Sequence, residues 1–212
     1  SIPKKSKIHV FSELKVYWGD YSQIKCELFL LEKSIKHNYS YYHLLSGSDL
    51  PIKSQNYIHD FFNKNFGCEF IHYQTDTFVQ EKNIARRITL YHFLQSYRKR
   101  YKITFLNNLF TLIDKSLLGI QVILNIKRYK IKFGSQWFSI THDLARYLVD
   151  NTSIIKKSFS KSSCADELFI QTMVYNSKFR YKLYNQNFDN NILGNMRLID
   201  WNRGNTIGNP YV

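Results

Sequence analysis

Apolar residues recur at helical spacing along much of the chain. Between positions 21 and 36 they stand at Ile24, Leu28, Leu31 and Ile35, separated by four, three and four positions. This spacing predicts a one-sided helix over 21–36 with Ser22 as its cap. Ser54 opens a second predicted helix, whose apolar face is made by Tyr57, Ile58, Phe61 and Phe62.

Further helical patterns follow in the second half of the chain. We predict helices over 84–97 and 105–117, a helix that Asp143 caps and that runs to Val149, and one that opens at Asp166 and runs through Tyr175. Apolar or alternating runs between the helices predict short strands. These strands are Lys7–Phe11, Ser40–Leu45, Cys68–Tyr73, Gln136–Thr141 and Arg197–Trp201.

The alternation of strands and helices predicts the fold class. It favours an α/β domain with a largely parallel sheet. There is no internal repeat or linker, so residues 1–212 are predicted to form a single domain. Ligands of such sheets bind where strands end in turns. The turn cluster over 46–51 is a junction of this kind, although a helix-entry turn capped by Asp49 explains it equally well.

Composition narrows the class of protein. The chain is 44% hydrophobic and 17% aromatic over 212 residues, which is enough to bury one substantial core. No apolar run reaches the length of a bilayer span, and no signal segment opens the chain. The formal net charge of +14 is compatible with binding to a nucleic acid, to an anionic membrane surface or to a phosphate-bearing ligand.

Three cysteines and seven histidines show no metal-binding spacing. An odd number of cysteines argues against a disulfide framework, so we expect a reduced, cytoplasmic setting. No Asp-x-Asp element, Gly-rich phosphate loop or Gly-x-Ser-x-Gly elbow is present. No metal or other cofactor is therefore predicted.

Five segments in order resemble one enzyme family. Leu44–Lys53 is similar to the Leu-Ser-Gly-x-Asp-x-Pro-Ile hallmark of core-2/I-branching N-acetylglucosaminyltransferases and of the related peptide O-xylosyltransferases. The other four segments also resemble motifs of this family. They are Val16–Ser22, Gly134–Phe138, Ala165–Phe169 and Arg197–Trp201.

The resemblance implies a fold and an activity. The family implies a Rossmann-like GT-A-type domain, here without its first strand and its C-terminal segment. It also implies a UDP-sugar donor, inversion at the anomeric carbon and no metal requirement. We therefore expect transfer of a sugar, most simply GlcNAc, to a carbohydrate hydroxyl in the synthesis of surface polysaccharide or another glycan by a bacterial enzyme. Xylosyl or another hexosyl transfer on the same scaffold, and a basic nucleic-acid-binding module, remain the alternatives.

Glu167 is the candidate general base. It matches the glutamate of the family's acidic helix start, and inverting transfer needs one base for the acceptor hydroxyl. Without the resemblance, Asp166 and Glu167 would be read as helix-capping carboxylates. Asp166 is assigned that capping role here.

On the basis of the family resemblance, the remaining candidates are assigned either to the donor or to the acceptor. Trp18, Gly19 and Asp49 are predicted to lie at the donor, although Trp18 is equally explained by surface packing and Asp49 by the loop. For the acceptor, the candidates are Arg86, Arg87, Trp137 and Trp201. Adjacent helical residues point about 100° apart, so one arginine at most should face the site. Core packing explains the two tryptophans equally well. A lipid-linked glycan acceptor would bring the basic enzyme to the inner face of the membrane.

Overall fold

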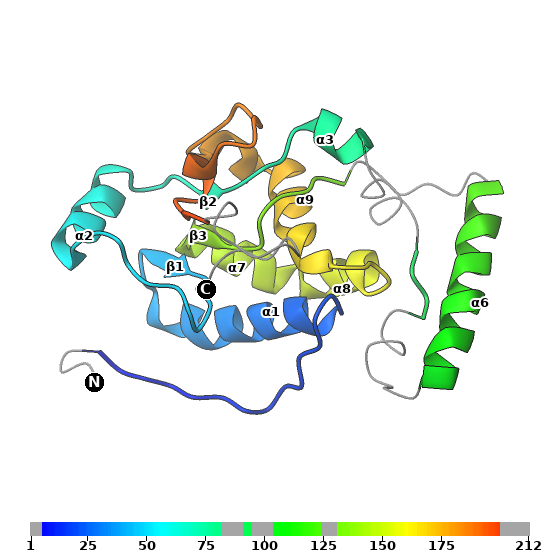
Figure 1. The fold of residues 1–212 in the computed structure, drawn as a ribbon. Coiled ribbons are helices and arrows are strands. Elements are labelled where there is room, and N and C mark those ends of the chain that lie inside the picture. The colour runs from blue at the N-terminus through cyan, green and yellow to red at the C-terminus, as the bar shows by residue number, and fades with distance from the viewer. Residues whose placement is uncertain (1–5, 82–90, 95–103, 124–130, 200–212) are drawn as a thin grey trace.

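The computed structural model describes residues 6–81, 91–94, 104–123 and 131–199. Figure 1 shows helices grouped around a small sheet, with one long helix at the end of the molecule. The elements in chain order are α1 (Ser22–Ser34), η1 (Ile35–His37), β1 (Tyr41–His43), α2 (Gln55–Lys64), β2 (Phe70–Ile71), α3 (Asp76–Glu81), α6 (Thr104–Ile123), β3 (Phe138–Thr141), α7 (His142–Asp150), α8 (Thr152–Phe159), η2 (Ala165–Glu167), α9 (Phe169–Tyr175), η3 (Lys178–Lys182) and η4 (Ile192–Gly194).

The sheet has the order β1-β3-β2, and both of its pairings are antiparallel. Tyr42 lies opposite Ile140 on one side of β3, and Phe70 lies opposite Ser139 on the other. The prediction of a largely parallel sheet is therefore wrong for the described strands. The sequence alternates helices and strands as crossover connections do, but β3 runs against both of its neighbours. All four residues of β3 are buried, as expected for a central strand.

The core lies between this sheet and the helices that cover it. The predicted apolar face of the first helix is confirmed, because Ile24, Leu28 and Leu31 of α1 are buried. α1 packs against α7, which contributes Leu144 and Leu148 to the same core. α1 also contacts η2, and a hydrogen bond from Gln23 to Asp166 places the N-terminal end of α1 beside it.

Several predicted helices are confirmed. Ser54 caps α2 by accepting a hydrogen bond from the backbone N–H of Tyr57 at 3.3 Å. α6 covers the helix predicted over 105–117. In the range 84–97 only residues 91–94 are described, and they form no helix.

Other local predictions need correction. Lys7–Phe11 forms no strand, and Ile8 and Val10 are exposed. Arg197–Ile199 also forms no strand, and residues 200 and 201 lie outside the described part.

Two predicted caps are also wrong. Thr141, rather than Asp143, caps α7 by accepting from the N–H of Leu144. Ser22 lies inside α1, and its hydroxyl accepts from the N–H of Tyr17 instead. Short polar side chains suit several neighbouring capping positions, so the backbone conformation decides which of them caps.

Within the described ranges, no helix combines the length and the apolar character that crossing a bilayer requires.

Candidate functional site

A tight turn precedes α1 and forms the first wall of the candidate site. Gly19 has a φ of 70°, in the left-handed region that glycine adopts without a steric penalty. Its N–H donates to the side-chain oxygen of Gln23, one helical turn further on. Trp18, the preceding residue, is 74% exposed. The turn thus buries its glycine and leaves the indole ring accessible.

η2 forms the second wall and is tied to this turn. The N–H of Cys164 donates to the carbonyl oxygen of Gly19 at 3.1 Å. The side-chain amide of Gln23 donates to the carboxylate of Asp166 at 3.1 Å. Gln23 therefore links Gly19 on one wall to Asp166 on the other, 143 positions apart in sequence.

Asp166 is not the predicted helix cap. Its side chain is buried, and η2 is preceded by Cys164 without a side-chain cap bond. Cys164 itself has φ 47° and ψ 54°, a left-handed conformation that is uncommon outside glycine. This backbone turns the chain so that Asp166 points to α1 and Glu167 stays half-buried beside it.

The segment before β3 forms the third wall. The N–H of Gly134 donates to the carbonyl oxygen of Glu167 at 3.0 Å. A Cβ at Gly134 would lie 2.0 Å from the carbonyl oxygen of His72, so a side chain does not fit there. This close approach explains the glycine of the Gly134–Phe138 motif.

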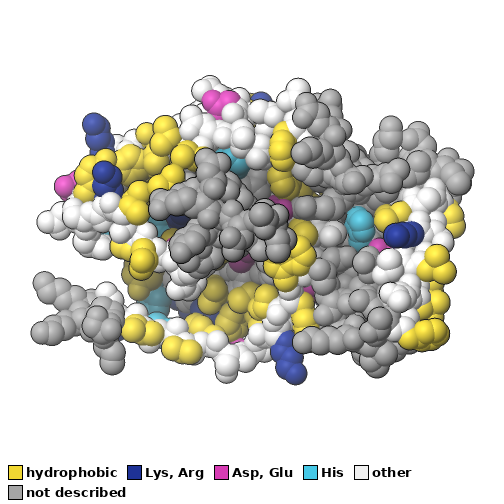
Figure 2. All heavy atoms as spheres, in the orientation of Figure 1, with side chains coloured by type: hydrophobic (Ala, Val, Ile, Leu, Met, Phe, Trp, Pro, Cys, Tyr) yellow, Lys and Arg dark blue, Asp and Glu magenta, His cyan; other side chains and the backbone are white. Residues whose placement is uncertain are grey.

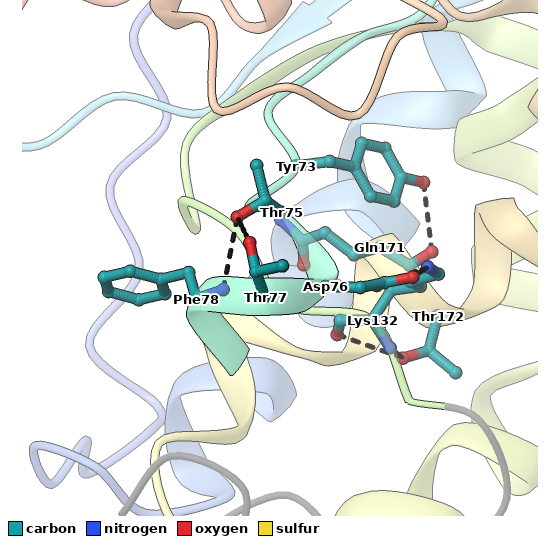
Figure 3. Close-up of polar contacts among 8 residues, drawn as sticks. All are labelled: Tyr73, Thr75, Asp76, Thr77, Phe78, Lys132, Gln171 and Thr172. Carbon is teal, nitrogen blue, oxygen red and sulfur yellow. Dashed lines mark hydrogen bonds and ion pairs between the residues drawn. The ribbon is translucent and has the colours of Figure 1, made fainter. Parts of the chain in front are cut away.

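A network of side chains fixes this segment against α3 and α9 (Figure 3). The ammonium group of Lys132 donates to both carboxylate oxygens of Asp76, at 2.7 and 3.0 Å. The N–H of Lys132 donates to the hydroxyl of Thr172, and Gln171 donates from its side-chain amide to the carbonyl oxygen of Ser135 at 2.7 Å. These bonds hold both sides of Gly134 in place.

The three walls enclose a small pocket of about 150 Å³. It brings together Glu167, Trp18 and Gly19, three of the residues predicted from sequence. The residues that line it are Trp18, Gly19, Gln23, Gln136, Cys164, Asp166 and Glu167. An accessible aromatic ring, two amides and a half-buried carboxylate therefore face one cavity. Such a combination suits a polar ligand with one flat face.

A buried acid lies next to the site. Burial raises the pKa of Glu27 well above its usual value, and the charge of Asp166 raises it further. Glu27 and Gln23 lie one turn apart on α1, so both belong to the helix face that meets η2. The carboxyl groups of Glu27 and Asp166 are therefore close enough for the charge of one to disfavour the charge of the other.

The other predicted site residues lie elsewhere. The carboxylate of Asp49 accepts from the N–H of Ser46 at 2.8 Å and so stabilises its own turn. Trp137 is half-buried, and its carbonyl oxygen accepts from Asn195 at 3.0 Å. Neither side chain is among those that line the small pocket. Arg86, Arg87 and Trp201 lie outside the described residues.

Sequence reasoning missed Gln23, Gln136 and Cys164. Gln136 adjoins Trp137 in a recognised motif, so that motif pointed to the segment, and the structure adds the side chain of Gln136 to the pocket lining. Gln23 follows the Val16–Ser22 segment directly, and only the fold shows that its amide reaches Asp166. No sequence signal marks Cys164.

A larger hollow of about 590 Å³ lies between the 7–11 segment, the second half of α1 and β1. None of the predicted site residues lines it. In the described part of the chain, no group of three or more His, Cys, Asp or Glu residues is arranged to hold a metal ion.

Comparison with known proteins supports the motif-based assignment. No curated protein matches this chain. The family model described as Core-2/I-Branching enzyme matches residues 5–210. That range includes every segment that forms the small pocket. Since the match spans almost the whole sequence, the chain belongs to the core-2/I-branching enzyme family and is a glycosyltransferase.

Proposed function

We propose that this glycosyltransferase moves a sugar, most simply GlcNAc, from a UDP-sugar to a carbohydrate hydroxyl with inversion and without a metal ion. The observation that carries the proposal is the position of Glu167. Its carboxylate shares a pocket with Trp18 and Gly19, which come from the opposite end of the chain. A base in such a pocket can meet a donor and an acceptor at once.

The reaction assigns one task to Glu167. Its carboxylate takes the proton of the acceptor hydroxyl while that oxygen attacks the anomeric carbon. The bond between the anomeric carbon and the diphosphate oxygen breaks on the opposite face, and UDP leaves with the bonding electrons. One glycosidic bond forms, one bond to phosphate oxygen breaks, and the configuration inverts.

The surrounding side chains suit this task. The exposed indole of Trp18 offers an apolar surface for a pyranose or uracil ring. The amides of Gln23 and Gln136 offer hydrogen bonds to sugar hydroxyls. A metal-independent reaction needs cationic side chains for the leaving diphosphate, and the net charge of +14 provides a surplus of them. Asp49, Arg86, Arg87, Trp137 and Trp201 remain proposed substrate contacts.

The product proposed is a surface polysaccharide or a related glycan. A lipid-linked acceptor would bring the enzyme into peripheral contact with a membrane, and the basic composition supports such contact.

A donor screen tests the proposal. We expect UDP release in the presence of acceptor to be fastest with UDP-GlcNAc among UDP-GlcNAc, UDP-xylose, UDP-glucose and UDP-galactose. A preference for UDP-xylose, UDP-glucose or UDP-galactose would keep the mechanism but replace the transferred sugar. No UDP release with any donor across an acceptor array would contradict the proposal.

Two further measurements separate the alternatives. UDP should raise the melting temperature, whereas a single-stranded oligonucleotide of equal charge should not. Protection by the oligonucleotide alone would favour the nucleic-acid-binding module. EDTA should leave turnover unchanged, and complete loss of activity on adding it would contradict metal independence.

A further inference from the structure

α6 has its apolar face turned outward. Figure 2 shows hydrophobic side chains in a column at the end of the molecule where Figure 1 places α6. Five large apolar side chains of α6 are exposed by 40–76%, and they fall within an arc of about 100° of the helix. We call them the α6 stripe. Its members are Phe105, Leu109, Leu112, Ile113 and Ile120.

On the opposite side of α6, two polar residues are buried among half-buried apolar ones. Asp114 is 2% exposed and Gln121 is 5% exposed. The side chain of Gln121 accepts from the N–H of Tyr91 at 2.8 Å and donates to its carbonyl oxygen at 2.9 Å. Asp114 lies 3.7 Å from the imidazole of His92. The N–H of His92 in turn donates to the carbonyl oxygen of Lys161, just beyond α8.

These polar contacts fix the rotation of the helix. Rolling α6 to bury its stripe would break both hydrogen bonds of Gln121 and expose the Asp114–His92 pair. α1 shows the ordinary arrangement, with its apolar residues facing the core. The α6 stripe is therefore an apolar surface that the described fold itself keeps in solvent, and such surfaces mark interaction sites.

The charges that flank α6 in the sequence indicate which kind of partner the α6 stripe binds. The chain just before α6 carries Arg98, Lys99, Arg100 and Lys102, and the chain just after it carries Lys127, Arg128 and Lys130. These seven residues lie outside the described part, and only their sequence enters the argument. An apolar helix face flanked at both ends by basic sequence is typical of helices that lie in the interface of an anionic membrane. α6 itself carries only Asp114 and Lys115 as charged residues, so the stripe is uncharged.

We propose that the α6 stripe inserts into the headgroup region of an anionic lipid surface and lies parallel to it. This goes beyond the proposed membrane contact, because it names the surface and the residues that enter the lipid. It depends on binding alone, so its failure would leave the proposed transfer reaction untouched.

The test is co-sedimentation of the full chain with vesicles of phosphatidylcholine containing 30% phosphatidylglycerol, at moderate salt, compared with vesicles of pure phosphatidylcholine. We expect binding to the anionic vesicles that falls as salt rises. Leu112→Asp should lower the partition coefficient at least about tenfold. The substitution removes an apolar anchor and adds a negative charge to the protein, which the anionic lipid surface repels. Ile154→Asp is the matched control, since Ile154 is similarly exposed on α8, and it should bind as the wild type does.

A spectroscopic readout separates insertion from simple charge attraction. The emission added by Phe105→Trp should shift to the blue on anionic vesicles and be quenched by brominated lipid. Unchanged emission, or equal binding by Leu112→Asp and wild type, would overturn the proposal. So would a wild-type dimer that Leu112→Asp converts to a monomer, because the stripe would then be an interface between copies of the chain.

Discussion

The region around the small pocket and the region of α6 place polar and apolar groups in opposite ways. Near the pocket, α1 turns Ile24 and Leu28 into the core, and Gln23 joins Gly19 to Asp166 across the two walls. In α6, Asp114 and Gln121 face inward and the apolar stripe faces outward. We propose that the first region orients a ligand and that the second binds a lipid surface. An amphipathic helix can thus serve either purpose, depending on which of its faces finds a partner inside the chain.

The largest expected effect is on turnover and is confined to the pocket. Glu167→Gln keeps the volume of the side chain but removes the base, so we expect kcat to fall about 10²- to 10⁴-fold. Circular dichroism and the melting temperature should stay as in the wild type. Glu32→Gln, at an exposed position of α1, is the control and should keep full activity. A folded Glu167→Gln protein with near wild-type turnover would show that another group is the base.

The next effect concerns a buried carboxyl group on the residue that directly precedes β2. Glu69 is fully buried, and its carboxylate oxygens bond to the N–H and the hydroxyl of Thr141 at 2.9 and 2.6 Å. Burial raises the pKa of Glu69 to about 7, against the opposing effect of the Thr141 hydrogen bonds. Among nearby charges, Lys182 lowers this pKa and Asp143 raises it.

Because the folded protein holds this proton more tightly than the unfolded chain does, stability is lost as pH rises from the unfolded pKa through about 7. Between pH 5 and pH 8 we expect the wild type to lose about 3 kcal/mol of unfolding free energy relative to Glu69→Gln. Urea titrations of both proteins across this range measure the difference. Parallel pH profiles would contradict the raised pKa.

Each of the two regions contains a glycine that can be tested, Gly134 beside the pocket and Gly119 in α6. Gly134→Ala would put a methyl group 2.0 Å from the carbonyl oxygen of His72, beside the hydrogen bond to Glu167. We expect a loss of about 1–3 kcal/mol in unfolding free energy, as for other overpacked positions, together with lower kcat. Gly47→Ala is the control, because nothing lies within 4 Å of its added Cβ. Equal stability of Gly134→Ala and Gly47→Ala would mean that the segment before β3 can move away.

The smallest effect has the opposite sign and lies in α6. An added Cβ at Gly119 meets nothing within 4 Å, and the residue is in the interior of a helix. Gly119→Ala should therefore raise the unfolding free energy by roughly 0.5–1 kcal/mol, because alanine restricts the unfolded chain. Chemical denaturation measures this gain. A loss of stability instead would show that a neighbour packs against this side of α6.

The sequence by itself determined the family, the apolar face of α1, the cap of α2 and the segment that carries Glu167. These depend on residues close together in sequence, where periodicity and motif spacing act directly. It proposed Trp18, Gly19 and Glu167 as candidates without showing that they meet.

Only the tertiary structure decided the direction of β3, the role of Asp166 and the orientation of α6. Strand direction depends on how distant segments pack, and a short strand reads the same in a parallel or an antiparallel pairing. Asp166 looks like a helix cap until Gln23 is brought to it from 143 positions away. The pattern of α6 marks an apolar face but does not say which way it turns. Contacts of Asp114 and Gln121 with the 91–92 segment settle that orientation, and they exist only in the folded chain.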